Sequence, residues 1–271
     1  MKATTSSGRI QTPWLIFLAS IVLFAVLGFA LSRTGDRHQH AKPPLLVYCA
    51  ASLKTPLEAI SREYEKEKGV QVQLQFGGSQ TLLANIEISK RGDLFLPADE
   101  SYLGTGRNKG LIAETIPLAR MTGVLAVRKG NPKNIHALTD LLRSDVSLAQ
   151  ANPDAAAIGK LVRESLQKTG QWEPLKAHTK VFKPNVNDVA NDLKLGSVDA
   201  GFIWDAQLAQ YPELEAVPIP ELANITGHIA AAVLRCSSQG EAALQFAGYL
   251  SDREHGLKQL KLNGFKPPGS P

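Results

Sequence analysis

Phe76-Gly77-Gly78-Ser79-Gln80-Thr81-Leu82 is the stretch that decides the fold. It follows Val70–Phe76, where apolar residues at every second position predict a strand with one apolar face. It precedes Thr81–Ile88, whose apolar spacing predicts a helix. The two glycines permit a tight turn, and Ser79 is a residue type that favours the N-cap of a helix. Because the first N–H groups of a helix have no partner within it, the turn predicts either a structural cap or one wall of an anion site.

The same plan of strand, small-residue turn and helix recurs along the chain. Leu45–Cys49 is an apolar run that predicts a buried strand, and Ala50-Ala51-Ser52 follows it. A helical apolar face then continues to about Gly69, and Leu94–Leu96 predicts a third strand. Alternating strands and helices predict a parallel sheet with right-handed crossovers. We therefore expect an α/β fold.

A second set of strand–helix units lies between about residues 120 and 228. Predicted helices begin near Ala156 and at Asn185–Asp188, and the predicted strand Gly201–Trp204 comes after them. The chain then returns with a strand over Ala230–Leu234 and two closing helices. Two such sets predict two lobes, with a ligand bound between them at the carboxyl ends of the strands.

Length and composition are those of a globular protein. The chain has 271 residues, of which 44% are hydrophobic and 20% charged, enough for one large domain or two smaller ones. The net charge is +5, but residues 1–37 carry four basic and one acidic residue. The remainder holds 26 basic and 24 acidic residues, with no basic run interleaved with aromatic residues. This balance argues against a nucleic-acid-binding protein.

The N-terminus carries an uncharged segment, Trp14–Leu31, of 18 residues. This length is at the lower limit for crossing a bilayer and rather long for the apolar region of a signal peptide. Lys2 and Arg9 precede it, as an export signal requires. We predict that residues 1–43 are a signal or anchor segment followed by a linker. The rest of the chain is then periplasmic or otherwise extracytoplasmic, either released by cleavage or held by a transmembrane helix.

The two cysteines, Cys49 and Cys236, are far apart and form no Cys-x-x-Cys motif. We expect two separate thiols that pack as small hydrophobic residues. A disulfide between them in an exported protein is the alternative.

Three motifs resemble the molybdate-binding protein family of ABC importers. They are Tyr48–Leu53 (YCAASL), Gly77–Leu82 (GGSQTL) and Gly92–Asp99 (GDLFLPAD), in that family's order and spacing. Ala156–Gly170 and Val198–Trp204 extend the resemblance, which covers nearly all of residues 44–265. It implies a type II periplasmic binding protein fold, with two lobes that are each a mixed sheet flanked by helices and a ligand cleft between them.

The resemblance also implies how the chain is divided and what it does. Lobe 1 would comprise residues 44–121 and 229–271, and lobe 2 residues 122–228. The protein would be a monomeric solute-binding protein, without enzymatic activity or cofactor, that delivers its ligand to an ABC permease in the membrane.

The ligand implied by the resemblance is a tetrahedral oxyanion, molybdate or tungstate, held by neutral donors. Ser52 and Ser79 would supply hydroxyl and backbone N–H groups from lobe 1. Ile158 and Val186 would donate backbone N–H groups at helix starts in lobe 2. Trp204 stands where the family usually has a tyrosine, and can donate only from its indole N–H. The segment around Ile158 also lacks the family's usual proline, so sulfate, phosphate or another small anion stays open.

An enzyme is the competing class. A serine hydrolase would need a base beside Ser52 or Ser79, and no Gly-x-Ser-x-Gly elbow is present. The candidate histidines are scattered along the sequence: His136, His178, His228 and His255. Three carboxylates lie at the edges of predicted strands, namely Asp93, Asp99 and Asp205. We expect these carboxylates to be caps and turn residues.

Overall fold

The computed structural model of the chain describes residues 21–24, 26 and 43–268. The chain divides into two compact units, Met1–Lys42 and Pro43–Pro271. In the first unit, Ile21–Phe24 and Val26 are helical, and the rest of the predicted export segment Trp14–Leu31 lies outside the described residues. Its retention or cleavage therefore stays a prediction. None of the helices in the described ranges is both long enough and apolar enough to cross a bilayer.

The second unit contains one continuous mixed sheet. Its strands, within residues 43–268, are β1 (Leu45–Ala50), β2 (Val72–Gly77), β3 (Leu94–Leu96), β4 (Ile112–Arg128), β5 (Leu148–Ala151), β6 (Thr179–Lys183), β7 (Ala200–Trp204), β8 (Leu214–Val217) and β9 (Thr226–Leu234). Their order is β2-β1-β3-β9-β4-β7-β5-β6, with β8 paired to β4. β1 is parallel to β2 and β3, and β5 is parallel to β6 and β7. β4 and β9 run antiparallel to their neighbours.

Helices pack against both parts of this sheet, the part around β1 and β2 and the part around β5 and β7. The α-helices described are α2 (Lys54–Lys68), α3 (Ser79–Ser89), α4 (Ser101–Asn108), α5 (Ala157–Gln167), α6 (Trp172–His178), α7 (Val186–Leu195), α8 (Gly240–Ser251) and α9 (Gly256–Leu262). Short 3-10 helices are η1 (Ala51–Leu53), η2 (Leu138–Leu142), η3 (Asp205–Ala209) and η4 (Pro220–Leu222).

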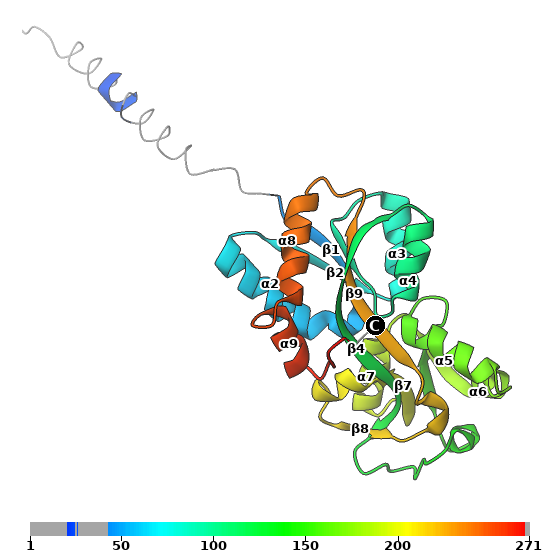
Figure 1. Ribbon diagram of the computed structural model, residues 1–271. Coiled ribbons are helices and arrows are strands. Elements are labelled where there is room, and N and C mark those ends of the chain that lie inside the picture. The colour runs from blue at the N-terminus through cyan, green and yellow to red at the C-terminus, as the bar shows by residue number, and fades with distance from the viewer. Residues whose placement is uncertain (1–20, 25, 27–42, 269–271) are drawn as a thin grey trace, which may run out of the picture. The chain divides into compact units, whose positions relative to one another are not determined.

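β4 and β9 lie side by side and join the two parts of the sheet, as Figure 1 shows. β4 pairs with β9 from Ile112 to Thr122 and then with β7 from Gly123 to Val127. Lobe 1 is the part built on β1, β2 and β3 with α2, α3, α4, α8 and α9. Lobe 2 is the part built on β5, β6, β7 and β8 with α5, α6 and α7.

Sequence patterns explain why these elements form where they do. β1 is buried along almost its whole length, as its continuous apolar run requires of a strand covered on both faces. β2 alternates between partly buried and exposed residues, as an edge strand does. α2 buries Leu57, Ile60 and Tyr64 on one face and ends at Gly69, whose φ of 65° is the left-handed conformation that glycine adopts without strain.

The predicted two-lobed mixed α/β fold is confirmed, with details that the sequence did not indicate. The sequence pattern of Ile135–Leu142 predicts a helix over the whole range. In the structure the helical part is shorter, Leu138–Leu142, and it is a 3-10 helix. α6 is a further helix that no pattern predicted. The mixed sheets of the two lobes share β4 and are therefore hydrogen-bonded into one. The lobe boundaries at residues 121/122 and 228/229 stay a prediction.

Candidate functional site

The five residues predicted to bind the ligand line a single cavity between the lobes. Ser52, Ser79, Ile158, Val186 and Trp204 all contribute to its wall. The other lining residues within the described chain are small or uncharged: Ala50, Ala51, Gly77, Gly78, Ala98, Ala156, Ala157 and Asn185. The cavity is narrow: the centre of a water-sized sphere can reach only about 10 Å³ of it. The closed lobes therefore leave room for about one water molecule.

Ser52 lies in η1, where β1 ends and the chain turns into α2. The residue is only 1% exposed, and its Oγ has no hydrogen-bond partner among the described residues. Buried hydroxyls are normally hydrogen-bonded, because an unpaired one loses its bonds to water without replacement. Ser52 therefore has a free hydroxyl in the cavity wall.

Ser79 follows the turn that decides the fold, but its hydroxyl does not cap α3. The N-cap position is Gly78, and Ser79 is the first helical residue. Instead, Ser79 Oγ accepts a hydrogen bond from the backbone N–H of Ala98, at 3.0 Å. With an acceptor site used in this way, the O–H of Ser79 is still free to donate.

Gly78 lies where the two lobes approach most closely around the cavity. A Cβ at this position would lie in close conflict with the carbonyl oxygen of Ala155 and 2.8 Å from that of Pro184. Both atoms belong to the backbone of lobe 2, so they cannot be moved by a side-chain rotation. Next to Gly78, the N–H of Gln80 donates to the carbonyl of Ala155, at 3.0 Å. The glycine is thus needed for the lobes to meet.

Ile158 and Val186 present helix N-termini from lobe 2. Ile158 is the second residue of α5 and Val186 the first residue of α7. Backbone N–H groups in the first turn have no acceptor inside the helix, and the positive end of the helix dipole lies there. The side chain of Ile158 extends towards Gly123 of β4, where its Cδ1 would be 3.1 Å from an added Cβ. The isoleucine side chain is therefore accommodated beside β4, away from the backbone N–H that would donate to a ligand.

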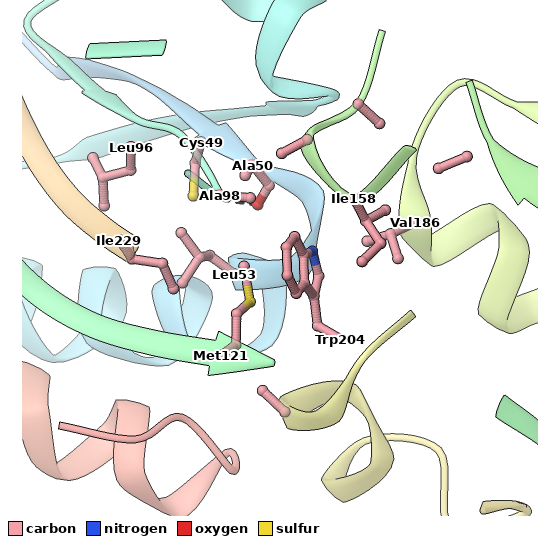
Figure 2. Packing of buried hydrophobic residues seen from close by; sticks show 14 of the residues in the cluster. Cys49, Ala50, Leu53, Leu96, Ala98, Met121, Ile158, Val186, Trp204 and Ile229 are labelled. Carbon is pink, nitrogen blue, oxygen red and sulfur yellow. Dashed lines mark hydrogen bonds between the residues drawn. The ribbon is translucent and has the colours of Figure 1, made fainter. Parts of the chain in front are cut away.

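Trp204 ends β7 and is 1% exposed. Figure 2 shows its indole ring between Leu53 and Ala50 on one side and Ile158 and Val186 on the other. Gly227 makes room for the ring, since a Cβ there would be 3.0 Å from Trp204 Cη2.

A chain of hydrogen bonds runs from Trp204 to lobe 1. The backbone N–H of Trp204 donates to Gln207 Oε1, at 3.2 Å, and Gln207 Nε2 donates to Asn187 Oδ1, at 2.7 Å. Asn187 Nδ2 then donates to the carbonyl of Ala51, at 2.8 Å. The backbone of Trp204 is thereby linked to η1, which carries Ser52.

Further contacts cross between the lobes outside the cavity. Thr55 Oγ1 donates to Gln210 Oε1, at 2.7 Å. Lys160 Nζ donates to Ser101 Oγ, at 3.0 Å, and lies 5.0 Å from the centre of the Tyr102 ring. Together with the bond between Gln80 and Ala155, these contacts describe lobes that are closed upon each other.

The three candidate carboxylates make hydrogen bonds within the fold. Asp93 accepts from Leu46 N–H and the Ser237 hydroxyl, Asp99 from Ser101 N–H, and Asp205 from Thr122 N–H. Asp99 is a turn residue, as expected. Asp205 accepts from its neighbour Ala206 but also from Thr122, and Asp93 accepts from two distant segments, so these two carboxylates connect parts of the fold that are far apart in sequence. Cys49 is buried, Cys236 is partly exposed, and both are free thiols.

Several residues of the site were not predicted from the sequence. Asn187 and Gln207 link the backbone of Trp204 to η1, while Gly123 and Gly227 leave the space that large side chains fill. Asn187 lies directly after the predicted Val186, which was the available signal. The local sequence gives no sign of the role of the two glycines, because the side chains that they make room for come from distant segments of the chain.

A two-lobed α/β fold with an uncharged cavity lined by hydrogen-bond donors defines a solute-binding protein. The chain belongs to the family of bacterial extracellular solute-binding proteins, whose model matches residues 45–266. It is 28% identical over 228 residues to the molybdate-binding protein ModA of Mycobacterium tuberculosis, covering 83% of this chain and 85% of the relative. The resemblance to molybdate-binding proteins is thus confirmed.

Solved structures share the fold. The periplasmic molybdate-binding protein of Azotobacter vinelandii superposes with a TM-score of 0.68 at 21% identity, covering 83% of this chain and all of that one. The sulfate-binding protein SubI of M. tuberculosis superposes with a TM-score of 0.70 at 20% identity, covering 83% and 86%. Both have the predicted architecture, so the similarity of fold does not distinguish between the two anions.

Proposed function

We propose that this chain is the extracytoplasmic binding protein of an ABC importer and that it binds a tetrahedral oxyanion, molybdate or tungstate. The donors are the hydroxyls of Ser52 and Ser79, the backbone N–H groups of Ile158 and Val186, and the indole N–H of Trp204. The relationship to a molybdate-binding protein supports this choice of ligand. A membrane permease is the corresponding partner, and the binding protein acts as a monomer.

The observation that carries the proposal is the unpaired hydroxyl of Ser52. Leaving a buried polar group unsatisfied costs about 1–3 kcal/mol. An oxygen atom of a bound anion would supply the missing acceptor. The same anion would meet Ser79, whose hydroxyl is oriented by Ala98. Two serines, each at the carboxyl end of a neighbouring parallel strand, thus face one ligand.

The absence of charge in the described wall supports recognition by dipoles. A dianion in this cavity would be held by hydroxyl, indole and amide donors at helix N-termini, as anions commonly are. Such donors reject a protonated anion, since its O–H group would face another donor. Molybdate, tungstate and sulfate, which are dianions at neutral pH, therefore suit the site better than monoprotonated phosphate.

The small free volume supports a hinged mechanism. A tetrahedral oxyanion is larger than the water-sized space between the lobes, so the lobes must be further apart than in this structure both to admit it and to hold it. Ligand contacts from both lobes would then favour the closed form. The proposed hinge is the β4–β9 ribbon near the boundaries at residues 121/122 and 228/229.

A hydrolytic role for the serines has no support in the cavity. A nucleophilic serine requires a base within hydrogen-bond reach. The lining residues among the described part of the chain include neither histidine nor carboxylate.

Calorimetric titration of the purified protein with molybdate, tungstate, sulfate and phosphate tests the proposal. We expect molybdate and tungstate to bind with similar affinity and sulfate more weakly, because sulfate is smaller. Phosphate should bind better as the pH rises and its dianion becomes dominant. If none of the four anions gives a heat of binding, the proposal is wrong. If sulfate binds more tightly than molybdate and tungstate, sulfate is the ligand.

A further inference from the structure

Three potential metal ligands gather on the outer side of lobe 1, away from the cavity. Glu63 and Glu67 lie one turn apart on α2, and His255 directly precedes α9. His255 Nδ1 is 3.5 Å from Glu63 Oε1 and 4.0 Å from Glu67 Oε1. Figure 1 shows α2 and α9 near each other, and their residues are in contact. Segments almost 190 residues apart thus bring one imidazole and two carboxylates together.

The imidazole of His255 is held in a defined orientation. Its ring stacks on that of Tyr249, with centroids 4.3 Å apart and an interplanar angle of 20°. Nδ1 faces the two glutamates, whereas Nε2 lies 3.9 Å from Asp252 Oδ1. Metal-binding histidines commonly direct their second ring nitrogen to a carboxylate, which fixes the tautomer. In this structure Asp252 is too far from Nε2 for such a hydrogen bond, although it is within ion-pairing distance. Nδ1 makes a long hydrogen bond to Glu63 Oε1 that a metal ion would replace.

Tyr249 is an independent sign of a ligand at this position. It is 7% exposed, and its hydroxyl makes no hydrogen bond within residues 43–268. Burial and then the charges of Glu63 and Glu67 raise the pKa of Tyr249, so it remains a neutral donor. The hydroxyl lies near Glu67 but lacks the geometry of a hydrogen bond. A carboxylate that shifts to bind a metal could accept this O–H and satisfy it.

We propose that Glu63, Glu67 and His255 form a binding site for a divalent first-row transition-metal ion such as Zn²⁺. One imidazole nitrogen and carboxylate oxygens are ligands that such ions accept, whereas Mg²⁺ and Ca²⁺ prefer oxygen alone.

The observed geometry is close to that of a bound ion. Tetrahedral ligands at about 2.1 Å from a metal are about 3.4 Å from one another. The distance from His255 Nδ1 to Glu63 already has this value, and all three ligand atoms lie within 4.8 Å of one another. The side chains are about one-third exposed, so both carboxylates can rotate inward and water can complete the coordination.

The metal would fasten α2 to the segment that joins α8 and α9. Since a ligand that binds only the folded state stabilises it, the ion would raise the stability of lobe 1. The oxyanion cavity contains none of these residues, so this site is independent of the proposed function.

Thermal unfolding of the full chain with and without ZnCl₂ tests the proposal. His255→Gln and Glu67→Gln remove one ligand each, and His228→Ala is the matched control because His228 is an exposed histidine of β9. All four proteins retain His38 and His40, so any binding by these residues is common to them. We expect Zn²⁺ to raise the melting temperature of the wild type and of His228→Ala. In the two ligand variants, Zn²⁺ affinity should be at least about tenfold lower.

Titration with Co²⁺ gives a second measurement that does not depend on stability. Visible absorption bands of coordinated Co²⁺ should appear with the wild type and disappear with Glu67→Gln. Equal responses of wild type and both ligand variants would overturn the proposal. So would a wild type whose melting temperature is unchanged by Zn²⁺ and which gives no Co²⁺ absorption bands.

Discussion

Replacing Ser52 with alanine should affect ligand affinity and protein stability in opposite directions. The hydroxyl of Ser52 is buried and unpaired in the protein alone. Its removal therefore eliminates an unsatisfied polar group, and the free energy of unfolding without ligand should stay the same or rise, by up to about 3 kcal/mol. The hydrogen bond from this hydroxyl to a charged oxygen would be lost, at about 1.5–3 kcal/mol. This corresponds to a dissociation constant about 10-fold to 150-fold higher.

Two measurements give these quantities. Calorimetric titration with molybdate provides the dissociation constant, and urea unfolding without ligand provides the free energy of unfolding. Ser61→Ala is the matched control, because Ser61 on α2 is also buried with an unpaired Oγ but does not line the cavity. It should change stability in the same direction and leave affinity unaltered.

Two results would refute this reasoning. If Ser52→Ala bound molybdate within about twofold of the wild type, where about tenfold is the least expected, Ser52 would not contact the ligand. If it lost more than about 1 kcal/mol of stability while Ser61→Ala did not, the hydroxyl of Ser52 would have a partner in the free protein.

Other substitutions and reagents test further parts of the structure. Gly78→Ala should weaken molybdate binding strongly, because the added Cβ meets the backbone carbonyls of Ala155 and Pro184 in the closed lobes; a larger radius of gyration in small-angle scattering with molybdate would show it, and unchanged affinity would contradict it. Trp204→Phe removes the indole donor and should lower the affinity for molybdate. Because Trp204 lines the cavity, molybdate should change the tryptophan fluorescence of the wild type but not of this variant; a change that persisted in the variant would have to come from another tryptophan. Burial raises the pKa of both thiols, but Cys49 is fully buried whereas Cys236 is only partly so. A thiol reagent at neutral pH should therefore modify Cys236 in the native protein and both cysteines only after unfolding; prompt modification of two thiols in the native state would contradict this.

The fold was predictable because its signals are local. Continuous apolar runs such as Leu45–Cys49 and helical faces such as that of α2 are written in consecutive residues. The alternation of these elements limits the topology to a few arrangements. The helix α6 was missed because it has only seven residues, and a proline lies at its third position.

The sequence predicted five residues that all line one cavity, but it did not indicate their contacts. The motifs placed Ser79 correctly in the cavity, yet its predicted role as N-cap is wrong. Its hydroxyl bonds instead to Ala98, which is 19 residues further along the chain. Similarly, the space for Trp204 is created by Gly227, and that for Ile158 by Gly123. Partners brought together by the tertiary fold leave no pattern in the local sequence.

The pairing of β3 with β9 also bears on how the chain acquires its structure. Leu94 is opposite Val233, so lobe 1 remains incomplete until almost the entire polypeptide is available. Most strands of lobe 2, by contrast, come from one uninterrupted stretch, β5 to β8. Closing a long loop carries an entropic cost before its contacts form, and pairing of distant strands slows folding. Lobe 2 can therefore fold before β9 is available, whereas lobe 1 cannot be completed until then. A chain truncated before residue 226 would leave the edge of β3 without its partner strand and expose it.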